Sequence, residues 1–130
     1  MITRIGLLIS VSLISQNSLG STGSLICLNP ATGAAITVPR FSSGGGQFLM
    51  NQNLVNNLRD QGPRHVQGSG FGNSNGDLAN CRYHSSIAGG YALSLTSLSG
   101  GILLTYSGQS SSGHQSTSLF YFNYGECTIR

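Results

Sequence analysis

The sequence contains no lysine and no tryptophan, and charged residues make up only 7% of its 130 positions. The formal net charge is +3, carried by arginines against three acidic residues. So weak an excess is not by itself a nucleic-acid signature, and we expect no DNA partner. Solubility must instead come from glycine, serine, asparagine and glutamine, which suits a disulfide-stapled extracellular protein better than a cytosolic one.

Long apolar runs are absent after residue 14. Arg4 is followed by an apolar run over residues 5–14 and then by small residues, which is the layout of a cleavable signal peptide. The run is shorter than the about 20 apolar residues that span a bilayer, so no membrane segment is expected in the mature form. Cleavage fits after Gly20 or after Gly23. The alternative is a core element that the mature protein keeps.

We therefore expect residues 1–20 to be a signal peptide and residues 21–130 to form one secreted domain with one modest core. The missing lysines have two explanations. One is drift in a composition with few charges. The other is selection on a secreted protein that acts inside a host cell, where lysine would accept ubiquitin.

Cysteine is scarce too, with three residues. Cys27 and Cys127 bracket nearly the whole mature chain, and a bridge closing a loop of about 100 residues would stabilise it by roughly 4–5 kcal/mol in the chain-entropy model. Cys81 would then be a buried or spare thiol, half of an intermolecular bridge, or a reactive nucleophile. Pairing of Cys81 with Cys27 or with Cys127 stays open. Ligand spacing is lacking, so we expect no metal site and no cofactor.

The order of local patterns predicts a helix early and strands late. Residues 24–28 and 35–38 read as a hairpin around a turn at residues 29–33. Apolar residues within 47–59 recur at spacings of three, four and seven, which predicts an amphipathic helix that ends at Gly62 and Pro63. The stretch 67–80 reads as a polar loop. Three later apolar runs predict an antiparallel sheet: residues 87–95, 101–106 and 118–124.

This order is an α+β pattern. We expect one N-terminal helix packed on a four-to-five-stranded antiparallel sheet, with the N- and C-terminal segments joined by a disulfide. In the last strand, alternation places Phe120 and Phe122 on one face and Tyr121 on the other.

Two short segments carry a resemblance to a known family. The chain closes on Glu126, Cys127 and Thr128, and residues 104–108 read Leu-Thr-Tyr-Ser-Gly. With the early cysteine, the expected helix and the late sheet, the region from about residue 25 to residue 128 resembles the fungal guanyl-specific ribonucleases and the ribonuclease-like secreted effectors built on their fold. In the enzymes the second segment reads Thr-His-Thr-Gly, and Tyr106 stands here in place of the histidine.

The resemblance implies a scaffold without the family's catalytic set. The family's glutamate would fall near His84, and its arginine near Gly89, Gly90 and Tyr91. Its early Tyr-Pro-His corresponds to residues 62–65, which keep a proline and a histidine but no tyrosine. Because that chemistry needs a base, an acid and a cation around the phosphate, conventional transphosphorylation is not expected.

The favoured hypothesis is a non-catalytic secreted effector or binding protein, monomeric, that acts on a host protein or RNA. Aromatic, histidine and arginine side chains can stack on bases or fill protein pockets. The candidates are Arg64, His65, Arg82, His84, Tyr91 and Tyr106. One alternative is a small secreted ribonuclease or toxin with His65 and His84 as acid and base. A second alternative is a secreted structural protein.

Overall fold

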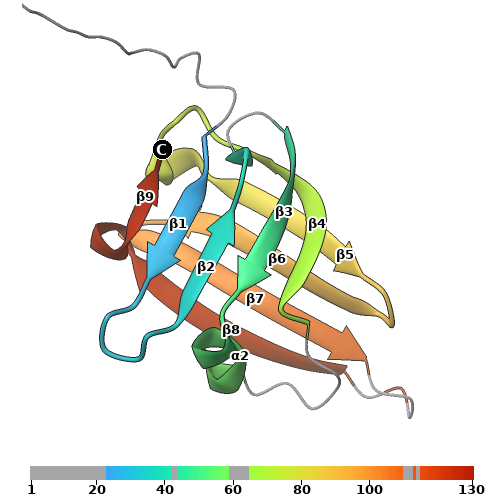
Figure 1. The fold of residues 1–130 in the computed structure, drawn as a ribbon. Helices are drawn as coiled ribbons and strands as arrows, with labels where there is room; N and C mark the ends of the chain where they lie inside the picture. The colour runs from blue at the N-terminus through green and yellow to red at the C-terminus, as the bar shows by residue number, and fades with distance from the viewer. Residues whose placement is uncertain (1–22, 42–43, 59–64, 110–112, 114) are drawn as a thin grey trace, which may run out of the picture.

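The computed structural model describes residues 23–41, 44–58, 65–109, 113 and 115–130. These residues form a nine-stranded antiparallel sheet in the order β8-β7-β6-β5-β4-β3-β2-β1-β9, curled into a nearly closed barrel (Figure 1). The strands are β1 (Leu25–Leu28), β2 (Ala35–Val38), β3 (Gly44–Met50), β4 (Gln67–Asn73), β5 (Arg82–Ile87), β6 (Tyr91–Leu98), β7 (Gly101–Gln109), β8 (Gln115–Asn123) and β9 (Cys127–Ile129). One short helix, α2 (Gln52–Asn57), and the 3-10 turns η3 (Leu78–Asn80) and η4 (Tyr124–Glu126) complete the described part.

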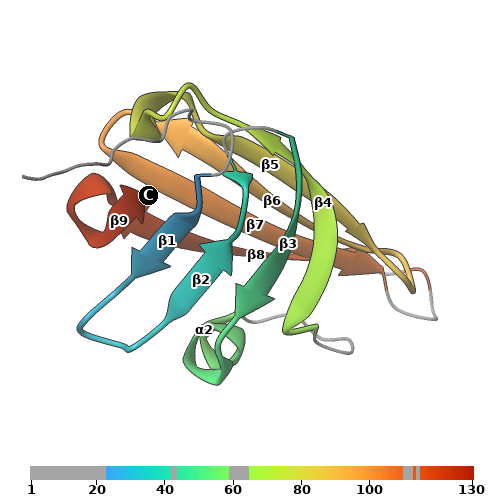
Figure 2. The same ribbon diagram turned by 45° about the horizontal axis from the view of Figure 1, so that its top comes forward.

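The sheet folds over on itself as two layers. Figure 1 shows β9, β1, β2 and β3 in front and β5 to β8 crossing obliquely behind them, with β4 at the turn from one layer to the other. The turned view in Figure 2 shows the same arrangement. Because the sheet order ends at β8 on one side and at β9 on the other, the barrel is open between these two strands.

Alternation along the strands fills the space between the layers. In β6, Tyr91, Leu93 and Leu95 are buried while the residues between them are partly exposed. Side chains of successive strand residues point to opposite faces, so each strand contributes every second residue to the core. The same cluster contains large side chains from both layers: Leu25, Ile36, Val38, Phe48, Met50, Tyr83, Leu104, Tyr106 and Phe122.

The α+β prediction is wrong, because the described chain is mostly strand and residues 47–59 do not form the one amphipathic helix expected. Within residues 47–59 the chain finishes β3 and then makes only the six-residue α2. β3 pairs with β2 on one side and β4 on the other, and its Phe48 and Met50 are buried at the two-residue period of a strand. The helical spacing in the sequence arose because buried residues of a strand and of a short helix follow each other. The helix-on-sheet fold implied by the ribonuclease resemblance is therefore wrong as well.

The stretch expected to be a loop is also different. Residues 67–73 form β4, at the turn between the layers, and Gly68, Gly70 and Gly72 follow one another at a two-residue period along it. A Cβ atom on Gly70 would overlap the carbonyl oxygen of His84 on β5. The glycines therefore let the backbones of β4 and β5 approach closely where the sheet bends. Their abundance made the segment resemble a loop in the sequence.

Other expectations are confirmed. Residues 24–28 and 35–38 do form a hairpin, with Leu25 opposite Val38 and Leu28 opposite Ala35. Cys27 and Cys127 are disulfide-bonded and lie directly opposite each other on β1 and β9. Phe120 and Phe122 share a face of β8, with ring centroids 4.8 Å apart, and Tyr121 lies on the other face.

The short helix closes one end of the barrel. Asn51 caps it by accepting a hydrogen bond from the Leu54 amide at 2.9 Å, and its side-chain amide donates to the Gly33 carbonyl at 2.7 Å. Leu54 and Val55 are buried in the core. In the residues described, no helix is long and apolar enough to cross a membrane.

Candidate functional site

The outward face of β4 and β5 carries a cluster of exposed aromatic and polar side chains. Alternation in β5 turns Tyr83 and Ser85 inward, so Arg82 and His84 face outward. In the antiparallel register Phe71 lies directly opposite His84, and Asn73 directly opposite Arg82. Four side chains of different chemistry therefore stand on one exposed face of the sheet: an aromatic ring, an imidazole, an amide and a guanidinium.

Phe71 is the most exposed large apolar residue that the structure describes, at 77% of its surface. Its cross-strand neighbour on β3 is Gly45. A Cβ atom on Gly45 would lie 3.5 Å from Cε1 of Phe71, so the ring lies beside a stretch of β3 backbone without a side chain. An exposed phenylalanine on a sheet face, with no side chain beside its ring on the β3 side, is available for stacking.

Two shallow hollows adjoin this surface and share Asn73 and Arg82. The first, of about 170 Å³, is lined by Phe71, Gly72, Asn73, Arg82, Tyr83 and His84. The second, of about 330 Å³, continues past Arg82 along the connection between β4 and β5, where Asn75 and Asn80 line it. Because Arg82 lies where the two meet, a ligand spanning both would pass over the guanidinium.

His84 contacts its neighbour Ser86, with 3.5 Å between Nε2 and the hydroxyl oxygen. Both residues are exposed and two positions apart on the same face of β5. The connection beyond Arg82 is ordered by Asp77, which accepts hydrogen bonds from the Ala79 amide at 3.0 Å and from Asn80 at 3.3 Å. The carboxylate is thus engaged in holding η3.

Beneath the surface, the bend is fixed by polar contacts. The Tyr83 hydroxyl donates to the Gly46 carbonyl at 3.0 Å, and Ser85 donates to the Ser69 carbonyl at 2.6 Å. Burial raises the pKa of Tyr83, and the hydrogen bond with Ser85 opposes this only in part. The phenol therefore stays protonated and can keep donating to β3, while the Ser85 hydroxyl holds β5 to β4.

The remaining sequence candidates lie elsewhere. Tyr91 and Tyr106 are core residues, 5% and 1% exposed, and their rings stack with centroids 5.9 Å apart. His65 is half-buried and packs against Tyr91 at 5.3 Å between ring centroids, on the interior side of the sheet. Arg64 falls outside the described residues. Of the six candidates, the structure thus brings Arg82 and His84 together on one exposed face.

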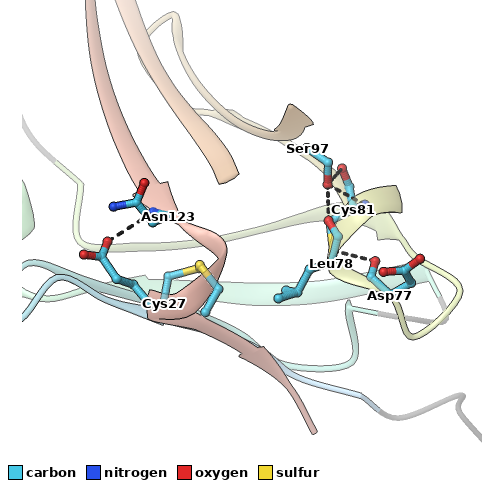
Figure 3. The surroundings of a disulfide bond; sticks show 8 residues. Cys27, Asp77, Leu78, Cys81, Ser97 and Asn123 are labelled. Atoms are coloured by element: carbon cyan, nitrogen blue, oxygen red, sulfur yellow. Dashed lines mark hydrogen bonds between the residues drawn. A yellow bond between two sulfur atoms is a disulfide. The ribbon is translucent and has the colours of Figure 1, made fainter. Parts of the chain in front are cut away.

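The three cysteines belong to the same core cluster, as Figure 3 shows with Leu78 drawn among them. The Cys81 backbone amide donates to the Ser97 hydroxyl at 2.8 Å, and its thiol donates to the Asp77 carbonyl at 3.4 Å. Burial is the largest cause that raises the pKa of Cys81 to about 11. A protonated, buried thiol is a poor nucleophile, so Cys81 has the properties of a structural cysteine.

Metal chemistry finds no support in the described segments, where no group of three histidine, cysteine or acidic residues comes together. Two buried polar atoms have no hydrogen-bond partner there: Nε2 of His65 and the hydroxyl oxygen of Ser118.

Comparison with known proteins returns nothing: no protein family, no curated protein and no solved structure matches this chain.

Sequence reasoning missed Phe71 and Asn73, because it treated residues 67–80 as a loop. A usable signal was present. Glycine at 68, 70 and 72 alternates with larger residues, and alternation at period two is a strand pattern even when the small residues occupy the buried face. That pattern would have placed Phe71 and Asn73 outward, on the same face as each other.

Proposed function

We propose that this protein is a non-catalytic secreted binding protein whose β4–β5 face binds single-stranded RNA. The observation that carries the proposal is the exposed Phe71 directly opposite His84, with Arg82 two residues further along β5. Flat sheet surfaces with exposed aromatic rings bind unpaired bases by stacking, and arginine contacts the phosphates between them.

The spacing of the site suits consecutive nucleotides. Residues i and i+2 of a strand are about 7 Å apart, which is the scale of neighbouring bases in an extended strand. A base stacked on Phe71 would therefore place its flanking phosphate toward Arg82. Beyond it, the amides of Asn75 and Asn80 offer both donors and acceptors to base edges.

Binding is favoured over catalysis by the positions of the two histidines. His84 faces outward, whereas His65 packs on the buried Tyr91 on the interior side. An acid and a base that cleave RNA must reach the same phosphate from its two sides. Side chains on opposite faces of one sheet do not meet this requirement, which argues against shared catalysis by His65 and His84.

Affinity should be weak and sensitive to salt. The described part of the site contains one cation, Arg82, and each phosphate contact to a single strand contributes a slope of about −0.7 in log K against log salt. Arg64, which the sequence adds to the candidates, would steepen that slope if it contacts a phosphate.

The test is fluorescence anisotropy of labelled single-stranded RNA of mixed sequence, at several salt concentrations. Phe71→Ala should weaken binding roughly tenfold, because one base–aromatic stack contributes about 1–3 kcal/mol. Arg82→Ala should weaken binding and flatten the salt dependence. Leu49→Ala is the matched control, since Leu49 is an outward-facing apolar residue on β3, 54% exposed, away from the site. Arg130→Ala controls for loss of one positive charge.

Two results would contradict the proposal. One is a failure of the expected binding pattern: either no RNA binding is detected, or Phe71→Ala and Leu49→Ala weaken it equally. The other is cleavage of the RNA that disappears in His84→Ala, which would make the protein a nuclease. Electrophoresis of the same RNA after incubation distinguishes intact ligand from cleaved product.

A further inference from the structure

The two open edges of the sheet differ in how they are protected. β9 is three residues long and is flanked by Glu126 and Arg130. Short strands and nearby charges are the usual devices that stop an edge from pairing with another chain. β8, at the other edge, is nine residues long and contains no charged residue. A strand of this length extends about 30 Å.

Within the described residues, β8 pairs with β7 alone. In its central stretch, residues 117–121, hydrogen bonds to residues outside β7 come from side chains, such as the Tyr121 hydroxyl donating to the Ser99 carbonyl at 3.3 Å. The backbone groups that face away from β7 are therefore available to another strand.

From these observations we propose that β8 pairs with β8 of a second copy of this chain, so that two barrels form a symmetric dimer through one continuous sheet. A second copy fits as the partner, because a long edge strand without charged side chains can pair antiparallel with itself about a two-fold axis. Leu119 is the middle residue of β8, so a two-fold axis through it pairs the stretch 117–121 antiparallel with the same stretch of the other copy. Leu119 then faces its own mate, and Thr117 faces Tyr121 of the other copy.

Charge and exposure agree with this pairing. Since β8 has no charged side chain, self-pairing opposes no like charges. Leu119 is 61% exposed and Tyr121 is 40% exposed, both on the outward face. Leu103 on β7 lies beside Tyr121 and extends this apolar strip. Pairing of the two β8 strands would cover the part of this apolar strip that lies along the β8 edge. The dimer differs from the monomer of the favoured hypothesis, and it is independent of the proposed RNA surface on β4 and β5.

The first test is sedimentation of the purified protein from low micromolar to near-millimolar concentration. We expect a monomer–dimer equilibrium, and Leu119→Lys should raise its dissociation constant at least about tenfold, because it sets two ammonium groups against each other at the axis. Leu49→Lys is the control. It adds the same charge to an exposed outward leucine, but on β3, which has strands paired on both sides.

A second test gives a positive signal. In a Cys81→Ala background, Leu119→Cys should form a disulfide-linked dimer on mild oxidation, because each residue 119 faces its mate. Thr117→Cys should not, since residue 117 would face residue 121. Circular dichroism of each variant confirms that the barrel is retained. A protein that stays monomeric at every concentration, equal effects of Leu119→Lys and Leu49→Lys, or equal crosslinking at 117 and 119 would overturn the proposal.

Discussion

The two layers of the barrel are held together in different ways. In the front layer, β1 and β2 are four residues long and β9 is three. In the back layer, β6 is eight residues long and β7 and β8 are nine. Paired length sets the number of hydrogen bonds between strands, so the back layer is held by long ladders. The front layer depends on the Cys27–Cys127 disulfide and on its buried side chains.

Replacing both disulfide cysteines should have the largest effect on this difference. We expect Cys27→Ala with Cys127→Ala to lower the free energy of unfolding by about 4–5 kcal/mol, since the bridge closes a loop of about 100 residues. Urea denaturation measures the loss. Hydrogen exchange should quicken most in β1 and β9, which the bridge joins. Equal quickening at every protected amide of β6 and β7 would show that the front layer is not the weaker one.

The bend between the layers can be tested at one glycine. Gly70→Ala should cost about 1–3 kcal/mol, because its methyl group would overlap the His84 carbonyl and force β4 and β5 apart. Gly125→Ala is the control, since nothing lies within 4 Å of a Cβ atom there. Thermal unfolding of the two variants compares them. Similar midpoints would mean that the two strands can separate at Gly70 without loss.

The smallest expected effect is a pH dependence from Cys81. Burial raises the pKa of its thiol from 9.0 to about 11, so the folded state holds a proton that the unfolded state releases between these values. Its contribution to stability is therefore full below about pH 9 and declines as the pH rises toward 11. Urea denaturation of the wild type and of Cys81→Ala, compared at pH 8, 9 and 10 with short incubation, isolates this contribution.

In that comparison, the difference between wild type and Cys81→Ala should shrink as the pH rises. A difference that stays constant would mean that Cys81 has the same pKa in both states. A thiol reagent offers a second view: at pH 8 Cys81 should react slowly in the folded protein and readily after denaturation.

Parts of the candidate site could be found from sequence and parts could not. Arg82 and His84 were recognisable as polar residues with binding chemistry, and alternation alone places them on one face of a strand. Phe71 was missed, because the glycines around it made the segment resemble a loop. Tyr91 and Tyr106 have the same side chain as Tyr121, yet they are buried and Tyr121 is exposed. Which face of a strand meets the core is settled by the strands that pack against it, not by residue type.

Local signals in the sequence were sufficient for two features: the opening hairpin, whose turn and alternating residues lie within a few positions, and the alternation of Phe120 and Phe122 in β8. The bracketing positions of Cys27 and Cys127 favoured a bridge between them but left pairing with Cys81 open, and the structure shows the Cys27–Cys127 bond. The folded molecule shows that residues 44–50 and 67–73 are also strands, and of these two only the second carried a local signal, its alternating glycines. Their hydrogen-bond partners are distant in sequence, and glycine becomes favourable in a strand only where another backbone comes too close for a side chain.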